Sequence, residues 1–255
     1  SKQYYDVKRI SLKSNNRVVS LTMLSNNLKK SVRSLHMRKF RQKYNKFLVE
    51  GPKSCLEVIN TLPSAIQTLI CTQEWYDENA KLLGNIAIAI AETDDLSELT
   101  LLDHNVSVML IYTGDSYLNT SYSDDWSIYL DDVQDPGNVG TILRLADWYG
   151  IKTVYHSQHS AKRDNPKVIQ SSMGAFIRVR SEVIDQAKFI AEFNKPFYIA
   201  DLKGININEM KNPEPGVIVI GNEGNGINKI FKTAHQTIVT IPGKGQAESL
   251  NASIS

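Results

Sequence analysis

Three short segments in the second half of the chain carry residues whose types and spacing could do chemistry. They are DPGNVG at 135–140 with Arg144 shortly after it, GNEGNG at 221–226, and IPGKGQAESLN at 241–251. Each has the composition of a turn, and together they offer one guanidinium, one carboxylate and a run of backbone amides. That set is sufficient to hold a cofactor and a phosphate group.

Two familiar nucleotide-binding motifs do not fit these glycines. The order G-x-x-G-x-G at 221–226 differs from the dinucleotide fingerprint G-x-G-x-x-G, and alone it indicates only a glycine-rich turn. The sequence PGKG at 242–245 resembles a phosphate-binding loop, but neither Ser nor Thr follows Lys244. The pattern therefore disfavours a nucleotide triphosphatase.

Apolar runs of strand length alternate with helical patterns around these segments. From residue 127 onward we predict strands at 127–131, 153–156, 177–180, 197–200, 217–220 and 237–240, and helices at 138–149, 166–171, 185–194 and 227–233. Such alternation favours a parallel sheet, whose ligands gather at the carboxyl ends of the strands. Asn138 is predicted to cap its helix, with Arg144 about one and two-thirds turns later. A cap followed by a surface arginine is the simpler structural alternative.

The first half of the chain predicts a second, smaller α/β layer structure. Its strands are expected at 47–50, 65–71, 86–91 and 106–112, and its helices at 55–61, 75–83 and 94–101, the last capped by Thr93. The polar segment 114–126 reads as a linker. We therefore expect a basic extension at 1–20, a first domain at 21–113 and a second domain at 127–255.

Charge is distributed unevenly along the chain. The first 50 residues hold 13 Lys and Arg against 2 Asp and Glu, whereas the remainder holds 16 against 25. The strongest run contains no acid and comprises Lys29, Lys30, Arg33, Arg38, Lys39, Arg41, Lys43 and Lys46. Leu28, Val32 and Leu35 lie near helical spacing in it, and Phe40 and Tyr44 could stack on unpaired bases. This one-sided charge favours RNA or DNA as the partner over the alternative of a solvated helix face.

Composition favours a soluble, cytoplasmic protein without a metal. The start at 1–6 is polar and the longest apolar runs have the length of a strand, so no membrane span or secretion signal is expected. Cys55 and Cys71 are the only cysteines, and they lie in no metal-binding spacing. Both are expected to be buried thiols in a reducing compartment.

The order of the three motifs resembles the SPOUT superfamily of S-adenosylmethionine-dependent RNA methyltransferases, and within it the SpoU/TrmH ribose 2′-O-methyltransferases. This resemblance covers residues from about 127 to 255. Residues from about 22 to 112, with FLVEG at 47–51, resemble more loosely the family's ribosomal-protein-like RNA-binding domain. The resemblance implies an α/β fold whose C-terminal parallel sheet carries a trefoil-knotted C-terminal segment, and a homodimer that shares its site. Only four residues follow Asn251, whereas the family's last helix usually runs for further turns. We expect this helix to continue past residue 255, and the alternative is a shortened knot.

The resemblance also implies roles for individual residues. S-adenosylmethionine, with no metal, would be lined by Ala200, Gly221, Asn222, Gly224, Ile241, Pro242 and Leu250. The residues around the reacting atoms would be Arg144, Asn138, Glu223, Asn251 and Ser249. In the family the arginine activates the ribose hydroxyl. Because a guanidinium is not readily deprotonated, we expect Arg144 to hold the adjacent phosphate and stabilise the developing alkoxide.

The remaining residues of this set are expected to position the first. Asn138 would orient Arg144 or the ribose, and Glu223 would order the second motif and could also order Arg144. Asn251 would hold the start of the last helix, and Ser249 would touch the substrate or the cofactor.

The expected function is methyl transfer to a ribose 2′-hydroxyl of structured RNA, with ribosomal RNA favoured over tRNA. One alternative is a catalytically silent RNA-binding assembly protein that keeps the fold, and the intact Asn138, Arg144, Glu223 and Asn251 argue against it. A base methylase on the same fold is a second alternative, which the SpoU-type motifs disfavour.

Overall fold

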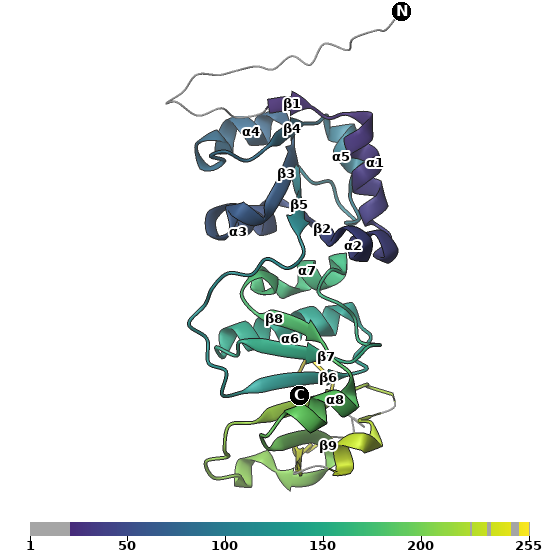
Figure 1. Cartoon of the computed structure of the whole chain (residues 1–255), viewed down its shortest axis with the longest axis vertical. Coiled ribbons are helices and arrows are strands. Elements are labelled where there is room, and N and C mark those ends of the chain that lie inside the picture. The colour runs from purple at the N-terminus through teal and green to yellow at the C-terminus, as the bar shows by residue number, and fades with distance from the viewer. Residues whose placement is uncertain (1–20, 225, 234–235, 246–249, 255) are drawn as a thin grey trace, which may run out of the picture. The chain divides into compact units, whose positions relative to one another are not determined.

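The computed structural model describes residues 21–224, 226–233, 236–245 and 250–254. The chain divides into two compact units, Ser1–Leu118 and Asn119–Ser255 (Figure 1). This division falls inside the segment 114–126 that reads as a linker. The extension at 1–20 and the candidate residue Ser249 lie outside the described residues. In the described part of the chain no helix is long and apolar enough to cross a membrane.

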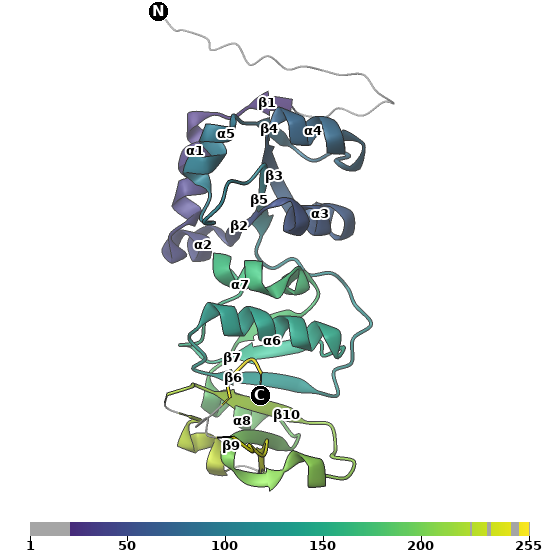
Figure 2. The ribbon, with the colours of Figure 1, turned by 180° about the vertical axis from the view of Figure 1, so that it is seen from behind.

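The first unit is a mixed sheet with helices on both faces. Its strands lie in the order β1-β4-β3-β5-β2, with β5 antiparallel to both β2 and β3. The strands are β1 (Leu21–Met23), β2 (Lys46–Glu50), β3 (Ile66–Cys71), β4 (Ile88–Ile90) and β5 (Val108–Thr113). Helices α1 (Asn26–Leu35) and α5 (Thr93–Leu99) lie on one side, and α3 (Pro52–Thr61) and α4 (Gln73–Asn79) on the other (Figures 1 and 2). The short helix α2 (Arg38–Tyr44) connects α1 to β2.

The sequence predicted most elements of this unit and missed some local details. Strand β1 was not predicted, because three residues are too few to show a period. Thr93 is the first residue of α5 and Glu92 holds the cap position, so the predicted Thr93 cap is wrong. The predicted helix 75–83 is α4 followed by a 3₁₀ turn, Ala80–Leu82. The two cysteines are buried and free as expected, and burial raises the pKa of Cys71 to about 12.

The second unit contains a parallel sheet in the order β11-β9-β10-β6-β7-β8. Its strands are β6 (Ser127–Asp131), β7 (Thr153–His156), β8 (Arg180–Val183), β9 (Phe197–Asn206), β10 (Val217–Gly221) and β11 (Gln236–Thr240). Its helices are α6 (Pro136–Trp148), α7 (Pro166–Ser172) and α8 (Gln186–Glu192). From β6 the chain adds β7 and β8 on one side of the sheet and then crosses to form β9, β10 and β11 on the other side of β6. The strand order therefore switches between β6 and β10. The carboxyl end of β6 is therefore the position where such sheets bind ligands.

Two apolar cores fix the loops at that edge. Ile128 and Leu130 of β6 pack with α6 and α7. Tyr129 points to the opposite face, where it packs with Phe189 of α8 and Phe231. Helix α6 approaches α7 closely at Gly140, where a Cβ atom would lie 1.9 Å from Ser171 Oγ and 2.6 Å from the carbonyl oxygen of Val168. Only glycine allows this packing, which holds the start of α6 in place.

Two predictions for this unit are wrong in detail, and a third is not tested. The strand predicted at 177–180 begins only at Arg180, since a 3₁₀ turn, Ala175–Ile177, precedes β8. A left-handed turn at Met173 and Gly174, with φ of 51° and 92°, shifts the chain there. The predicted helix 227–233 is only a 3₁₀ turn, Lys229–Thr233. Residues 246–249 lie outside the described chain, so the trefoil knot stays a prediction.

Candidate functional site

The first motif forms the start of α6, directly after β6. Asp135 is the N-cap residue, and its Oδ1 accepts a hydrogen bond from the backbone N–H of Asn138 at 2.9 Å. Pro136 follows in the first turn, where its fixed φ suits a helix start. The prediction that Asn138 caps this helix is therefore wrong, and Asp-Pro was the signal for the true cap. As a result the Asn138 side chain is available for a contact outside its own helix.

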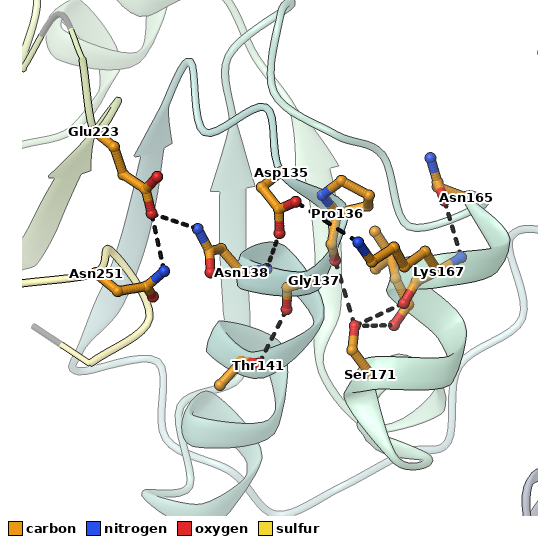
Figure 3. A network of polar contacts seen from close by, with 11 residues as sticks. Asp135, Pro136, Gly137, Asn138, Thr141, Asn165, Lys167, Ser171, Glu223 and Asn251 are labelled. Carbon is orange, nitrogen blue, oxygen red and sulfur yellow. Dashed lines mark hydrogen bonds and ion pairs between the residues drawn. The ribbon is translucent and has the colours of Figure 1, made fainter.

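That contact is with Glu223 of the second motif, as Figure 3 shows. Asn138 Nδ2 donates to Glu223 Oε1 at 2.7 Å, and Asn251 Nδ2 of the third motif donates to the same oxygen at 3.0 Å. The backbone N–H of Ala252 also points to it, at 3.4 Å. Charge-assisted hydrogen bonds of this kind are stronger than neutral ones. One carboxylate oxygen therefore joins all three motifs.

The second motif is a tight loop closed on itself. Asn222 and Gly226 exchange two backbone hydrogen bonds, of 3.2 and 2.9 Å. A Cβ atom at Gly221 would lie 2.5 Å from Ile227 Cγ1 and 2.7 Å from the backbone of Gly226, so only glycine fits this approach. The side chain of Asn222 donates to the carbonyl oxygen of Asp132 at 2.9 Å and so fixes the loop to the end of β6.

Three of the residues predicted to line a cofactor lie at the end of the β9–β10 pairing, at the end of β10 and directly after β11. Pairing of β9 with β10 ends at Ile199, so Ala200 is the first residue past that ladder although β9 continues to Asn206. Gly221 is the last residue of β10, and Ile241 follows β11. The side chains of Ile241 and Leu250 are 39% and 47% exposed. Exposed apolar side chains beside a glycine loop fit the apolar rings of an adenosine group.

Arg144 stands apart from this network. It lies on the exposed surface of α6 and has no hydrogen bond or ion pair with any described residue. Neither Asn138 nor Glu223 therefore forms a hydrogen bond or ion pair with it in the described chain; each of these two binds the other instead. A guanidinium with its donors exposed can bind a phosphate from outside the chain. The described residues contain no group of His, Cys, Asp and Glu arranged to hold a metal ion.

Sequence reasoning missed a buried acid beneath the loops. Asp131, the last residue of β6, is 2% exposed and accepts a hydrogen bond from the backbone N–H of Asn228 at 2.6 Å. Gln186 donates a second hydrogen bond to it. Burial raises the pKa of the Asp131 carboxyl above its ordinary value. The doublet Asp131-Asp132 at the end of an apolar strand was the available signal.

The predicted RNA-binding cations of the first unit divide into two groups. Lys29 forms an ion pair with Asp95 of α5, and Arg33 forms one with Glu98 at 2.9 Å. Arg41 is buried and donates to backbone carbonyl oxygens at the end of α1. The cations without an ion pair to any described residue are Lys30, Arg38, Lys39, Lys43 and Lys46.

Aromatic rings accompany the unpaired cations on α2. Phe40 and Tyr44 stack with their planes 7° apart, Lys39 lies over the first ring and Lys43 over the second. Tyr44 is 47% exposed. This surface combines charge with ring faces, as proteins that bind single-stranded RNA do. The acids of α5, distant in sequence, compensate part of the basic run.

Comparison with known families agrees with this geometry. Residues 125–255 match the model of the SpoU rRNA Methylase family, and residues 26–109 match the MRM3-like substrate binding domain. A TrmH-family protein from Porphyromonas gingivalis has a solved structure that superposes with a TM-score of 0.77 at 33% identity, covering 91% of this chain and 95% of that one.

Curated relatives are similar over different extents. The chain is 33% identical over 133 residues to an uncharacterized tRNA/rRNA methyltransferase from Borreliella burgdorferi, which is 50% of this chain and 58% of that relative. It is 27% identical over 233 residues to the 23S rRNA (guanosine(2553)-2′-O)-methyltransferase RlmP of Bacillus subtilis, covering 89% of this chain and 91% of RlmP. The likeness to RlmP extends through both units.

Proposed function

This chain belongs to the SpoU rRNA methylase family of RNA methyltransferases, and we propose that it transfers a methyl group from S-adenosylmethionine to a ribose 2′-hydroxyl of structured RNA. The observation that carries the proposal is the shared contact at Glu223 Oε1. It brings Asn138 and Asn251 together from two other motifs, beside the strand ends that fit the cofactor. Three motifs far apart in sequence are thus held together at one site.

The chain's own residues can favour the reaction by positioning and charge. S-adenosylmethionine, when bound, supplies a methyl group on a positively charged sulfur. Arg144 would bind the phosphate next to the reactive ribose and stabilise the negative charge that develops on its 2′-oxygen as the proton leaves to solvent. Asn138, held by Glu223, would orient the ribose, and Asn251 would fix the third motif against the cofactor pocket.

We favour ribosomal RNA over tRNA as the substrate. The support is the match of the first unit to a substrate-binding domain and the similarity over both units to an enzyme named for 23S rRNA. The exposed cations and rings of α2 would contact this RNA. The cytoplasm, where ribosomal RNA is found in bacteria, is the compartment that the proposal implies.

A homodimer is part of the proposal. Helix α6, with its C-cap residue Tyr149, exposes Leu145, Trp148 and Tyr149 at 38%, 83% and 74%, on the helix that carries Arg144. Large apolar side chains this exposed are typical of a surface that another chain covers. A second copy docked on α6 would bring Arg144 close to an interface and would allow both copies to contribute to one site.

Methyl transfer to ribosomal RNA, followed by alkaline hydrolysis, tests the proposal. A 2′-O-methyl group blocks cleavage at its own phosphodiester bond, whereas a methylated base does not. Transfer from radiolabelled S-adenosylmethionine that creates a resistant bond supports the proposal. Labelled RNA that hydrolyses completely indicates a base methylase instead. Calorimetric titration with S-adenosylmethionine completes the test, because absence of binding and of transfer would indicate a catalytically silent RNA-binding protein.

A further inference from the structure

A polar cavity lies beside the proposed methyl-transfer site, at the carboxyl ends of β6, β7 and β8. It has a volume of about 260 Å³, and its lining includes Asp132, Gln158, His159, Asp185, Gln186 and Asn228. None of these residues belongs to the candidate cofactor or catalytic set. The cavity adjoins that set, because the carbonyl oxygen of Asp132 accepts the hydrogen bond from Asn222 of the second motif.

One wall of the cavity is held rigid from beneath. The buried carboxylate of Asp131 accepts hydrogen bonds from the Gln186 side chain and the backbone of Asn228. Asn228 Nδ2 also donates to Gln186 Oε1 at 3.3 Å. These contacts fix the two amide side chains, so the cavity does not have to be formed by its ligand.

Two carboxylates of the lining retain an acceptor with no partner among the described residues. Asp132 Oδ1 accepts the hydroxyl of Ser157, and Asp185 Oδ1 accepts the backbone N–H groups of Ala187 and Lys188 at the start of α8. No hydrogen bond within the described chain reaches Oδ2 of either residue. Gln158 and His159 are exposed and also have no partner there. The cavity therefore offers unused carboxylate oxygens together with an amide and an imidazole.

The two carboxylates of this lining disfavour a phosphate as the ligand and can bind a base. Two carboxylates repel an RNA phosphate at close range, whereas they accept N–H groups of an uncharged ring. The volume is below the usual range of 300 to 1,000 Å³ for pockets that enclose whole ligands, which suits a single base. Proteins read unstacked RNA bases through hydrogen bonds to the Watson–Crick edge.

We propose that this cavity binds a guanine base of the RNA. This proposal rests on the proposed function, because it takes RNA as the substrate. Guanine presents two adjacent donor groups on its Watson–Crick edge, N1–H and the 2-amino group, which match a carboxylate. Adenine and cytosine each present an amino group next to a bare ring nitrogen, and uracil presents a single N–H. His159 or Gln158 would donate to the guanine O6 atom. Guanine recognition here would select the nucleotide presented for methylation.

Titration of the full chain with free nucleosides, monitored by ligand-observed NMR, tests this proposal. Guanosine and inosine are compared with adenosine, cytidine and uridine. Inosine lacks only the 2-amino group, so we expect it to bind about tenfold more weakly than guanosine through loss of one charge-assisted hydrogen bond. Asp132→Asn and Asp185→Asn should weaken guanosine binding by about tenfold or more. Asn tolerates the left-handed backbone of residue 132, with φ of 57°, and Asn also caps helices.

Glu192→Gln is the matched control, because it removes an exposed charge from α8 outside the cavity lining and should leave guanosine binding unchanged. Equal binding of all five nucleosides, no guanosine binding up to its solubility limit, or unchanged binding by both Asn variants overturns the proposal. Methyl transfer by the unmodified chain is measured in parallel. Selective guanosine binding without transfer refutes the proposed function alone, and transfer without selective binding refutes the guanine site alone.

Discussion

Glu223 and Asn138 are 85 positions apart in the sequence, yet Glu223 Oε1 accepts a hydrogen bond from Asn138 Nδ2 at 2.7 Å. The same oxygen accepts the side chain of Asn251. Because the remaining partners are neutral amides, the carboxylate is the only charged member of the contact. Its removal should therefore loosen three motifs at once.

Glu223→Gln tests this relationship. The side-chain oxygen of the glutamine is uncharged, so each hydrogen bond to it is weaker than the corresponding bond to the carboxylate. We therefore expect the rate of methyl transfer to fall by about tenfold to a hundredfold. The turnover rate and the affinity for S-adenosylmethionine are measured separately. Glu209→Gln, an exposed carboxylate in the same unit, is the control and should leave both unchanged. Full activity in Glu223→Gln would show that the contact does not position the reacting groups.

Arg144→Ala separates substrate positioning from cofactor binding. Arg144 has no partner in the described chain, so its loss should not disturb the cofactor residues. We expect transfer to be abolished, with cofactor affinity nearly intact by calorimetry. Arg144→Lys should retain only part of the activity, because an ammonium lacks the planar fork that binds phosphate. Arg180→Ala, an exposed arginine of β8, is the control. If cofactor affinity falls as far as the rate does, Arg144 is not a phosphate clamp.

The cations of α2 should dominate RNA affinity. Replacing Arg38, Lys39 and Lys43 by Ala should weaken RNA binding and reduce the slope of log K against log salt by about two to three units, since fewer counterions are released. The matched control replaces Lys29 and Arg33, which are already paired with acids of α5. It should change the slope much less. Equal effects in the two variants would place the RNA on α1 as well.

Point substitutions are needed here because truncation would damage the fold. Removing residues 1–46 would delete Val32 and Leu35, which are 0% and 2% exposed in the core of the first unit. Loss of RNA binding by that truncated chain would therefore report unfolding as readily as loss of charge.

The sequence predicted the parallel sheet and the three motifs because both depend on local patterns. Apolar runs such as Val217–Gly221 mark strands, and glycines mark the turns that follow them. It could not predict that Asn138 faces Glu223, or that α5 neutralises part of the basic run, because those contacts join distant segments. The strand predicted at 177–180 begins too early, because a buried apolar residue such as Ile177 fits the sequence pattern of a strand and of a 3₁₀ turn equally well.

The buried His156 should make the stability of the second unit depend on pH. Burial, with a smaller contribution from Lys162, lowers the pKa of His156 from 6.5 to about 3. Between these values the unfolded chain binds a proton that the folded chain does not. The free energy of unfolding should therefore fall as the pH drops from about 6.5 toward 3, by at most about 1.4 kcal/mol per pH unit from this group.

His156→Gln retains a polar group near Ser181 Oγ, which lies 2.7 Å from His156 Nε2, and should flatten this slope. Urea unfolding across the pH range measures it, with the exposed His159→Gln as control. Equal slopes in the two variants would show that His156 is not the group responsible.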